Sequence, residues 1–187
     1  MNICLKHMLL AAMILMVSLA AAAGDEPEGY LQVTGPSGLE FPRDHGAHPG
    51  HRTEWWYYTG NLESEDGQPF GFQLTLFRSQ LAPSAAGSTP AKQKSAWRTN
   101  QVYFGHIAIS DISDGRHWQA ENMARGTLGL AGAAHSGRAT KIWLYNWSIQ
   151  ITRDAHVLSA QTSDFSIQLT AVPLKERLSS TSRSMTA

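Results

Sequence analysis

Short stretches in which apolar and polar residues alternate are the feature that most constrains the fold of this chain. The clearest is Phe70–Arg78, FGFQLTLFR, in which every second residue from Phe70 to Leu76 is apolar. Side chains alternate between the two faces of a β-strand, so this period of two predicts a strand with one buried face. Arg78 continues the apolar face, and we expect its side chain to point inward.

Similar stretches recur along most of the chain. We predict further strands at 53–61, 101–110, 118–124, 141–152, 156–161 and 164–172. The Asp-Gly turn signal within 64–68 joins the first two strands into an antiparallel hairpin. The glycine-rich stretch 125–139 and the Ala/Ser/Pro-rich stretch 79–95 are expected to be loops. About seven short strands separated by turns are typical of an all-β antiparallel barrel or sandwich.

The first 23 residues differ from the rest. Lys6 and His7 precede an apolar run, which ends at the small residues Ala21 and Ala23. A charged start, a short apolar centre and an A-x-A exit indicate a cleaved signal peptide over 1–23, and hence a periplasmic or extracellular protein. An uncleaved membrane anchor is the alternative, although a spanning helix needs about 20 apolar residues.

Composition excludes several classes of function for the mature chain. Cys4 is the one cysteine of the sequence and lies in the predicted signal peptide, so cysteine catalysis and thiolate metal ligands are excluded. The 15 basic and 15 acidic residues balance, and no basic cluster points to nucleic acid. After signal cleavage we expect no transmembrane segment. We divide the chain into a signal peptide (1–23), a polar lead (24–42), one β domain (43–174) and a tail (175–187).

A histidine-rich stretch precedes the first predicted strand. His45, His48 and His51 are spaced by three and are followed by Glu54. Imidazole and carboxylate groups can bind metals, but the intervening Gly and Pro residues exclude a helix, and the spacing matches no zinc motif. We therefore predict that the protein needs no metal and no other cofactor. The histidines are then interpreted as part of an exposed loop rather than as a metal site.

Three polar residues are predicted to share one partly apolar site. By strand parity Glu54 points inward, where it loses solvation and becomes suited to proton transfer. We expect His106 to point inward with Val102 and Ala108, and Arg78 to pair with Glu54. Glu54 and His106 are the candidate catalytic residues, whereas the structural alternative is a buried ion pair with a core histidine.

Four segments carry a resemblance to a known family. They are HPGHRTEWWYYTGNL, GFQLTLFR, QVYFGHIAISD and WLYNWS. Together they resemble the secreted AttH-like proteins related to carotenoid 1,2-hydratase (hydroxyneurosporene synthase). The family motif carries over onto Glu54, onto His106 and onto all the candidate ligand-binding residues except Arg78, which is a candidate as the expected partner of Glu54. The candidate ligand-binding residues are His48, Arg52, Trp55, Trp56, Tyr57 and Arg78.

The resemblance implies a fold and an activity. The family fold is two lipocalin-like β-barrels in tandem, of which this chain matches the first. The resemblance ends near Leu174, which implies a truncated or frameshifted product with a disordered tail. The related hydratases add water to a carbon–carbon double bond without a cofactor, and their catalytic residues lie largely beyond the end of this chain.

Three functions remain open from the sequence. The first is a secreted lipocalin-like protein that binds an apolar or amphipathic small molecule, such as a carotenoid- or lipid-like ligand, through its many aromatic rings. The second is a hydratase or hydrolase with Glu54 or His106 as proton donor. The third is an accessory protein that partners an envelope transporter, which the resemblance suggests.

Overall fold

The computed structural model describes residues 29–35, 38–83 and 99–175, which form two antiparallel β-sheets. The described strands of the first sheet run in the order β1-β2-β3-β4 and those of the second in the order β5-β6-β7-β8-β9. The first sheet contains β1 (Thr53–Glu63), β2 (Pro69–Gln80), β3 (Gln101–Asp111) and β4 (Arg116–Arg125). The second contains β5 (Ala131–Ser136), β6 (Ala139–Leu144), β7 (Trp147–Ile151), β8 (His156–Gln161) and β9 (Ser166–Ala171). A short 3-10 helix, η1 (Arg43–His45), precedes β1.

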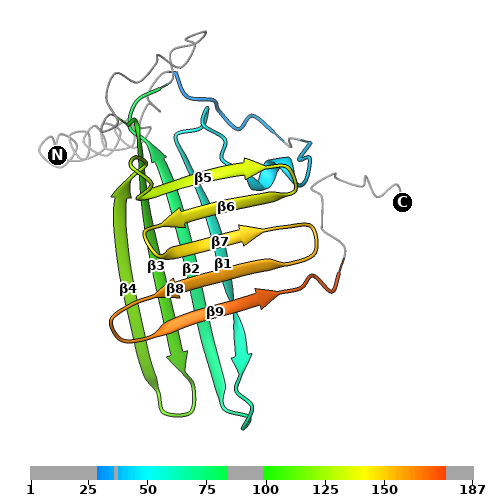
Figure 1. Ribbon diagram of the computed structural model, residues 1–187, viewed down its shortest axis with the longest axis vertical. Coiled ribbons are helices and arrows are strands. Elements are labelled where there is room, and N and C mark those ends of the chain that lie inside the picture. The colour runs from blue at the N-terminus through cyan, green and yellow to red at the C-terminus, as the bar shows by residue number, and fades with distance from the viewer. Residues whose placement is uncertain (1–28, 36–37, 84–98, 176–187) are drawn as a thin grey trace, which may run out of the picture.

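The two sheets pack face to face, and their strands cross rather than run side by side (Figure 1). Each sheet is a meander in which every strand pairs with its sequence neighbour. The predicted all-β antiparallel class is confirmed. Within the described residues, however, the sheets form an open sandwich rather than a closed barrel, since no ladder joins the first sheet to the second.

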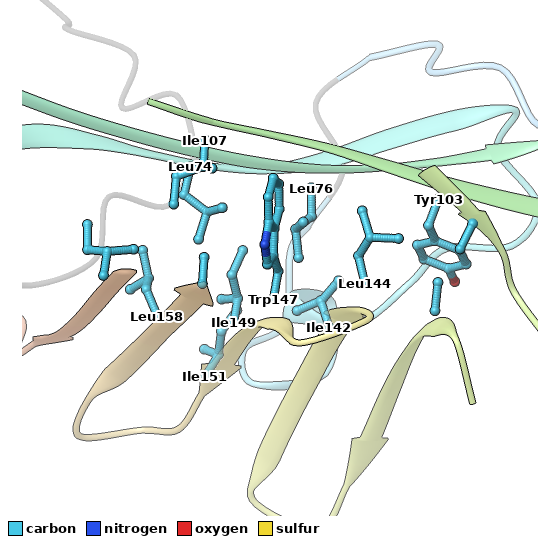
Figure 2. Packing of buried hydrophobic residues seen from close by; sticks show 14 residues of the cluster. Leu74, Leu76, Tyr103, Ile107, Ile142, Leu144, Trp147, Ile149, Ile151 and Leu158 are labelled. Carbon is cyan, nitrogen blue, oxygen red and sulfur yellow. The ribbon is translucent and has the colours of Figure 1, made fainter. Parts of the chain in front are cut away.

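The core lies between the sheets and consists of buried apolar side chains from both of them (Figure 2). Leu74 and Leu76 of β2 point toward the second sheet, as the alternation in the sequence predicts. Trp147 of β7 stands between the sheets and is one of the largest completely buried side chains. Burying a large apolar side chain contributes about 1.5–3 kcal/mol relative to leaving it exposed, so this layer holds the sheets together.

The predicted strand 141–152 is in fact two strands. β6 ends at Leu144 and β7 begins at Trp147, and these two residues are paired across the hairpin. Tyr145 sits in the two-residue connection with φ of +55°. Strand parity over 141–152 would place Trp143, Tyr145 and Trp147 on one face, and this interpretation is therefore wrong. The chain reverses between them, and such a turn is hard to see in sequence because a bulky Tyr is rare at positive φ.

The glycine-rich stretch 125–139, predicted to be a loop, contains the edge strand β5. Gly132 of β5 lies beneath the indole of Trp143, its pairing partner on β6. A strand with so many Gly and Ala residues has little side-chain signal of its own, and it forms because β6 provides a partner.

Several expectations fall outside the described residues. They concern the signal peptide at 1–23, most of the loop 79–95, and the tail apart from Lys175. Among the described residues, the structure contains no helix that is both long enough and apolar enough to cross a membrane.

Candidate functional site

Glu54 and Arg78 form an ion pair between β1 and β2. They are direct partners in the antiparallel register, and Arg78 Nε donates a hydrogen bond of 2.6 Å to Glu54 Oε2. Arg78 is completely buried, at 0% exposure, and its Nη2 donates to the carbonyl oxygens of His48 and His51, each at 2.9 Å. The predicted pairing of Glu54 with Arg78 is confirmed.

The ion pair anchors the histidine-rich segment to the sheet. The backbone N–H of His48 donates to Glu54 Oε2 at 2.8 Å, and the His48 Nδ1 lies 3.3 Å from Glu54 Oε1. Arg78 Nη1 reaches the side-chain oxygen of Gln80 at 3.4 Å. Because both carboxylate oxygens and the guanidinium are engaged by protein groups, the geometry is that of a structural anchor.

The histidines of the segment lie in different environments. His45 accepts a hydrogen bond of 2.9 Å at its carbonyl oxygen from the indole N–H of Trp56. The His48 Nε2 lies 3.6 Å from Asp44 Oδ1, and the Nδ1 of His51 contacts the carbonyl oxygen of Leu31 at 2.9 Å. No group of three or more His, Cys, Asp or Glu side chains is arranged to hold a metal ion within residues 29–35, 38–83 and 99–175.

Asp44 is a nearly buried carboxyl group that helps to hold this segment in place. The guanidinium of Arg43 and the backbone N–H of Glu40 hold the pKa of the Asp44 carboxyl well below its usual range. The Nη1 of Arg43 also lies 3.0 Å from Oε2 of Glu40. The carboxylate therefore stays ionised through the physiological range, and the polar contacts that order the segment persist.

His106 does not join the Glu54 site, and this part of the prediction is wrong. Its side chain is 47% exposed and lies 3.7 Å from Glu121 on the outer face of the first sheet. The inner face of β3 instead carries Tyr103 and Ile107, which are buried. Both alternating sets of β3 contain apolar residues, so the sequence did not decide which set faces the core.

An apolar row of three aromatic residues and one methionine crosses the outer face of the first sheet, with one residue from each strand. The pairing register aligns Trp55 with Phe77, Phe77 with Phe104, and Phe104 with Met123. The Phe77 and Phe104 rings are stacked, with centroids 4.6 Å apart and planes 10° apart. Trp55 is 62% exposed and Met123 68% exposed, so the two ends of this outer row are open to solvent.

Neighbouring groups extend the outer row on both sides. The ring of His106 lies 5.7 Å from that of Phe77, and Tyr57, half exposed, occupies the same face of β1. Beside Trp55 a hollow of about 300 Å³ is lined by Val33, His48, His51, Thr53, Glu54 and Trp55. The hollow joins the Glu54 anchor to the exposed aromatic rings.

A third cluster lies on the inner face of β1. The Tyr58 hydroxyl is hydrogen-bonded to the Nδ1 of His156 on β8 at 2.9 Å, and the His45 and His156 rings are 5.6 Å apart. Burial raises the pKa of Tyr58 to about 12. Sequence reasoning missed His156 because nothing local shows that β8 lies opposite β1.

The candidate ligand-binding residues are thus divided among four places. Trp55 and Tyr57 belong to the outer face, whereas Trp56 packs against the core. Arg78 is buried and His48 lies at the anchor, while Arg52 is exposed just before β1. Sequence reasoning missed the surface roles of Phe104 and Met123, which only the cross-strand register reveals. The functional roles of all these residues remain predictions.

The two crossed antiparallel sheets define an all-β sandwich of the lipocalin-like class. The chain matches the model of a family described as AttH-like over residues 32–185, and it belongs to that family. The match extends past Leu174, where the sequence alone suggested that the resemblance ends.

A solved structure is similar to this chain. It is a crystal structure at 2.00 Å of a candidate AttH from Nitrosomonas europaea, with 28% identity and a TM-score of 0.59. The similarity covers 79% of this chain and 41% of the other, so this chain spans less than half the length of that relative. A search of functionally curated proteins finds no match.

Proposed function

We propose that this protein is an exported binding protein that holds an apolar or amphipathic small molecule, carotenoid- or lipid-like, on the outer row. The observation that carries the proposal is the row itself, which presents Trp55, Phe77, Phe104 and Met123 on one face. Exposed apolar groups gathered into one patch are typical of binding sites, whereas single exposed apolar residues are common everywhere.

The arrangement of the core also favours an outer site. Buried side chains such as Trp147 and Leu76 occupy the space between the two sheets. A ligand inside the sandwich would need those side chains to move. The outer row requires no such rearrangement, and the hollow beside Trp55 adds polar groups, among them His48, that can orient the polar end of an amphipathic molecule.

The geometry favours binding over catalysis by the predicted pair. Both carboxylate oxygens of Glu54 accept hydrogen bonds from protein groups, namely Arg78 and the His48 backbone, so the side chain is held in place and is not directed at a substrate. His106 lies on the other face of the sheet from Glu54, so the two side chains do not meet at one reacting group.

Export is supported by the sequence of residues 1–23 alone, and the intact mass of the secreted product tests it.

The binding experiment uses the purified chain and N-phenyl-1-naphthylamine, a probe that fluoresces in apolar surroundings, with oleate as competitor. We expect Trp55→Ala to weaken probe binding by roughly tenfold or more, as removal of an aromatic anchor does at other interfaces. Met123→Lys introduces a charge at the far end of the row and should weaken binding as well. Both positions are exposed, so both variants should fold.

The matched control is Ile112→Ala. Ile112 is 59% exposed, close to the exposure of Trp55. It comes directly after the C-terminal end of β3, whereas the outer row crosses β3 near its N-terminal end. The Ile112→Ala variant should bind the probe as the unaltered protein does. Equal probe affinity in Trp55→Ala and in the unaltered chain would refute the outer row as the binding site.

A further inference from the structure

The second sheet carries a different surface, centred on Trp143. The residues paired with Trp143 are small or polar, with Gly132 on one side and Ser148 on the other. Ser159 and Gln168 continue the same row across β8 and β9. This composition contrasts with the outer row of the first sheet, and it calls for a different kind of ligand.

The indole of Trp143 is fixed in position. A Cβ placed on Gly132 would lie 2.5 Å from Cζ2 and 2.6 Å from Cη2 of Trp143, so the six-membered ring lies directly over the glycine. The indole N–H donates a hydrogen bond of 3.0 Å to the carbonyl oxygen of Gly129. The ring is therefore held against the sheet before any ligand arrives, which lowers the entropy cost of binding.

Trp143 borders a hollow of about 440 Å³ that contains groups suited to hydrogen bonding. The hollow is lined by Gly129, Lys141, Trp143, Tyr145, Asn146 and Ser148. These residues provide an ammonium, an amide, two hydroxyls and two aromatic rings, and none of them is acidic. Tyr145 is held at a φ of +55°, an arrangement of the turn that places it beside the hollow, and such backbone outliers occur preferentially at functional sites.

We infer that this hollow binds a sugar ring of a glycan. The C–H groups on one side of a pyranose are weakly positive and pack on the electron-rich face of an aromatic ring. The ring hydroxyls both donate and accept hydrogen bonds, and the side chains of Asn146, Ser148 and Lys141 offer partners of both kinds. Asn146 Nδ2 already donates to the carbonyl oxygen of Gln161 at 3.3 Å. An apolar ligand would still offer no hydrogen bond to the Lys141 ammonium or the Ser148 hydroxyl, which disfavours it.

Titration with cellohexaose, maltohexaose and chitohexaose tests the inference. In ¹⁵N-edited spectra the indole N–H resonance of Trp143, assigned by its loss in Trp143→Phe, should shift on addition of at least one of the three. Calorimetry should then show Trp143→Ala binding that sugar roughly tenfold more weakly or worse. The shift of the Trp143 resonance on addition of sugar is measured on the unaltered chain, so its size does not depend on how well a variant folds.

A glycine substitution separates ring placement from ring loss. Gly132→Ala retains the indole but displaces it from the sheet, so it should weaken sugar binding while leaving all aromatic side chains in place. Gly71→Ala is the matched control, because a Cβ there meets only atoms at 4.0 Å on the first sheet, and its affinity should be unchanged. No shift of the Trp143 resonance with any of the three sugars, or full affinity in Trp143→Ala, would overturn the site.

Discussion

Glu54 and Arg78 face each other across β1 and β2, and the guanidinium of Arg78 bonds both to the Glu54 carboxylate and to the backbone of the segment that precedes β1. One buried side chain therefore connects two strands and the histidine-rich segment. Its removal should affect stability and the order of that segment together.

We expect Arg78→Met to lower the free energy of unfolding by about 3–5 kcal/mol, because it leaves the partly buried Glu54 without its partner. Glu54→Gln should also destabilise strongly, since Arg78 is completely buried and would lose its counter-charge. Urea unfolding measures both. Arg43→Met serves as control: it removes an exposed guanidinium that pairs with Glu40 and Asp44, and it should cost about 1 kcal/mol or less. Losses below about 1 kcal/mol for both buried changes would contradict the role of the ion pair.

The orientation of β3 predicts opposite behaviour for two adjacent residues. Ile107→Ala should cost about 2–5 kcal/mol because Ile107 is buried between the sheets. His106→Ala should stay within about 0.5 kcal/mol, since the imidazole is exposed on the outer face. Denaturant unfolding of the two variants compares them directly. A larger loss for His106→Ala than for Ile107→Ala would place β3 in the opposite orientation.

Gly105 marks a close approach of the two sheets. A Cβ there would lie 2.8 Å from Leu76 Cδ2 and 3.1 Å from Leu144 Cδ2. We expect Gly105→Ala to destabilise the fold by about 1–3 kcal/mol through overpacking. The thermal midpoint should fall accordingly, whereas Gly71→Ala, whose Cβ would make only ordinary van der Waals contacts at 4.0 Å, should leave it unchanged or slightly raised. A neutral Gly105→Ala would mean that the sheets can separate at this point.

Two tyrosines predict how stability varies at alkaline pH. Burial raises the pKa of both Tyr58 and Tyr103 to about 12, against about 10 in the unfolded chain. The folded state therefore retains protons that the unfolded state releases, and stability should fall as the pH rises from about 10 toward 12. Urea midpoints across this range measure the loss. In Tyr58→Phe the loss should be smaller, and an unchanged pH dependence would show that Tyr58 does not contribute.

The sequence by itself determined the class of fold and one of the contacts at the site. The alternation of Phe70–Leu76 favours one buried face, so the inward direction of β2 follows from its own residues. A hairpin turn between β1 and β2 then brings Glu54 opposite Arg78, as predicted. These features are local, because strand parity and a short turn suffice to specify them.

Only the tertiary structure decided which face of β3 is buried, where the chain turns between β6 and β7, and which aromatic rings share a surface. β3 has apolar residues on both faces, and its orientation depends on the pairing of Leu74 with Ile107. The outer row exists because the register of four strands aligns Trp55 with Met123 across the sheet. Such alignments depend on contacts between residues far apart in the chain, and the local pattern of a single strand does not contain them.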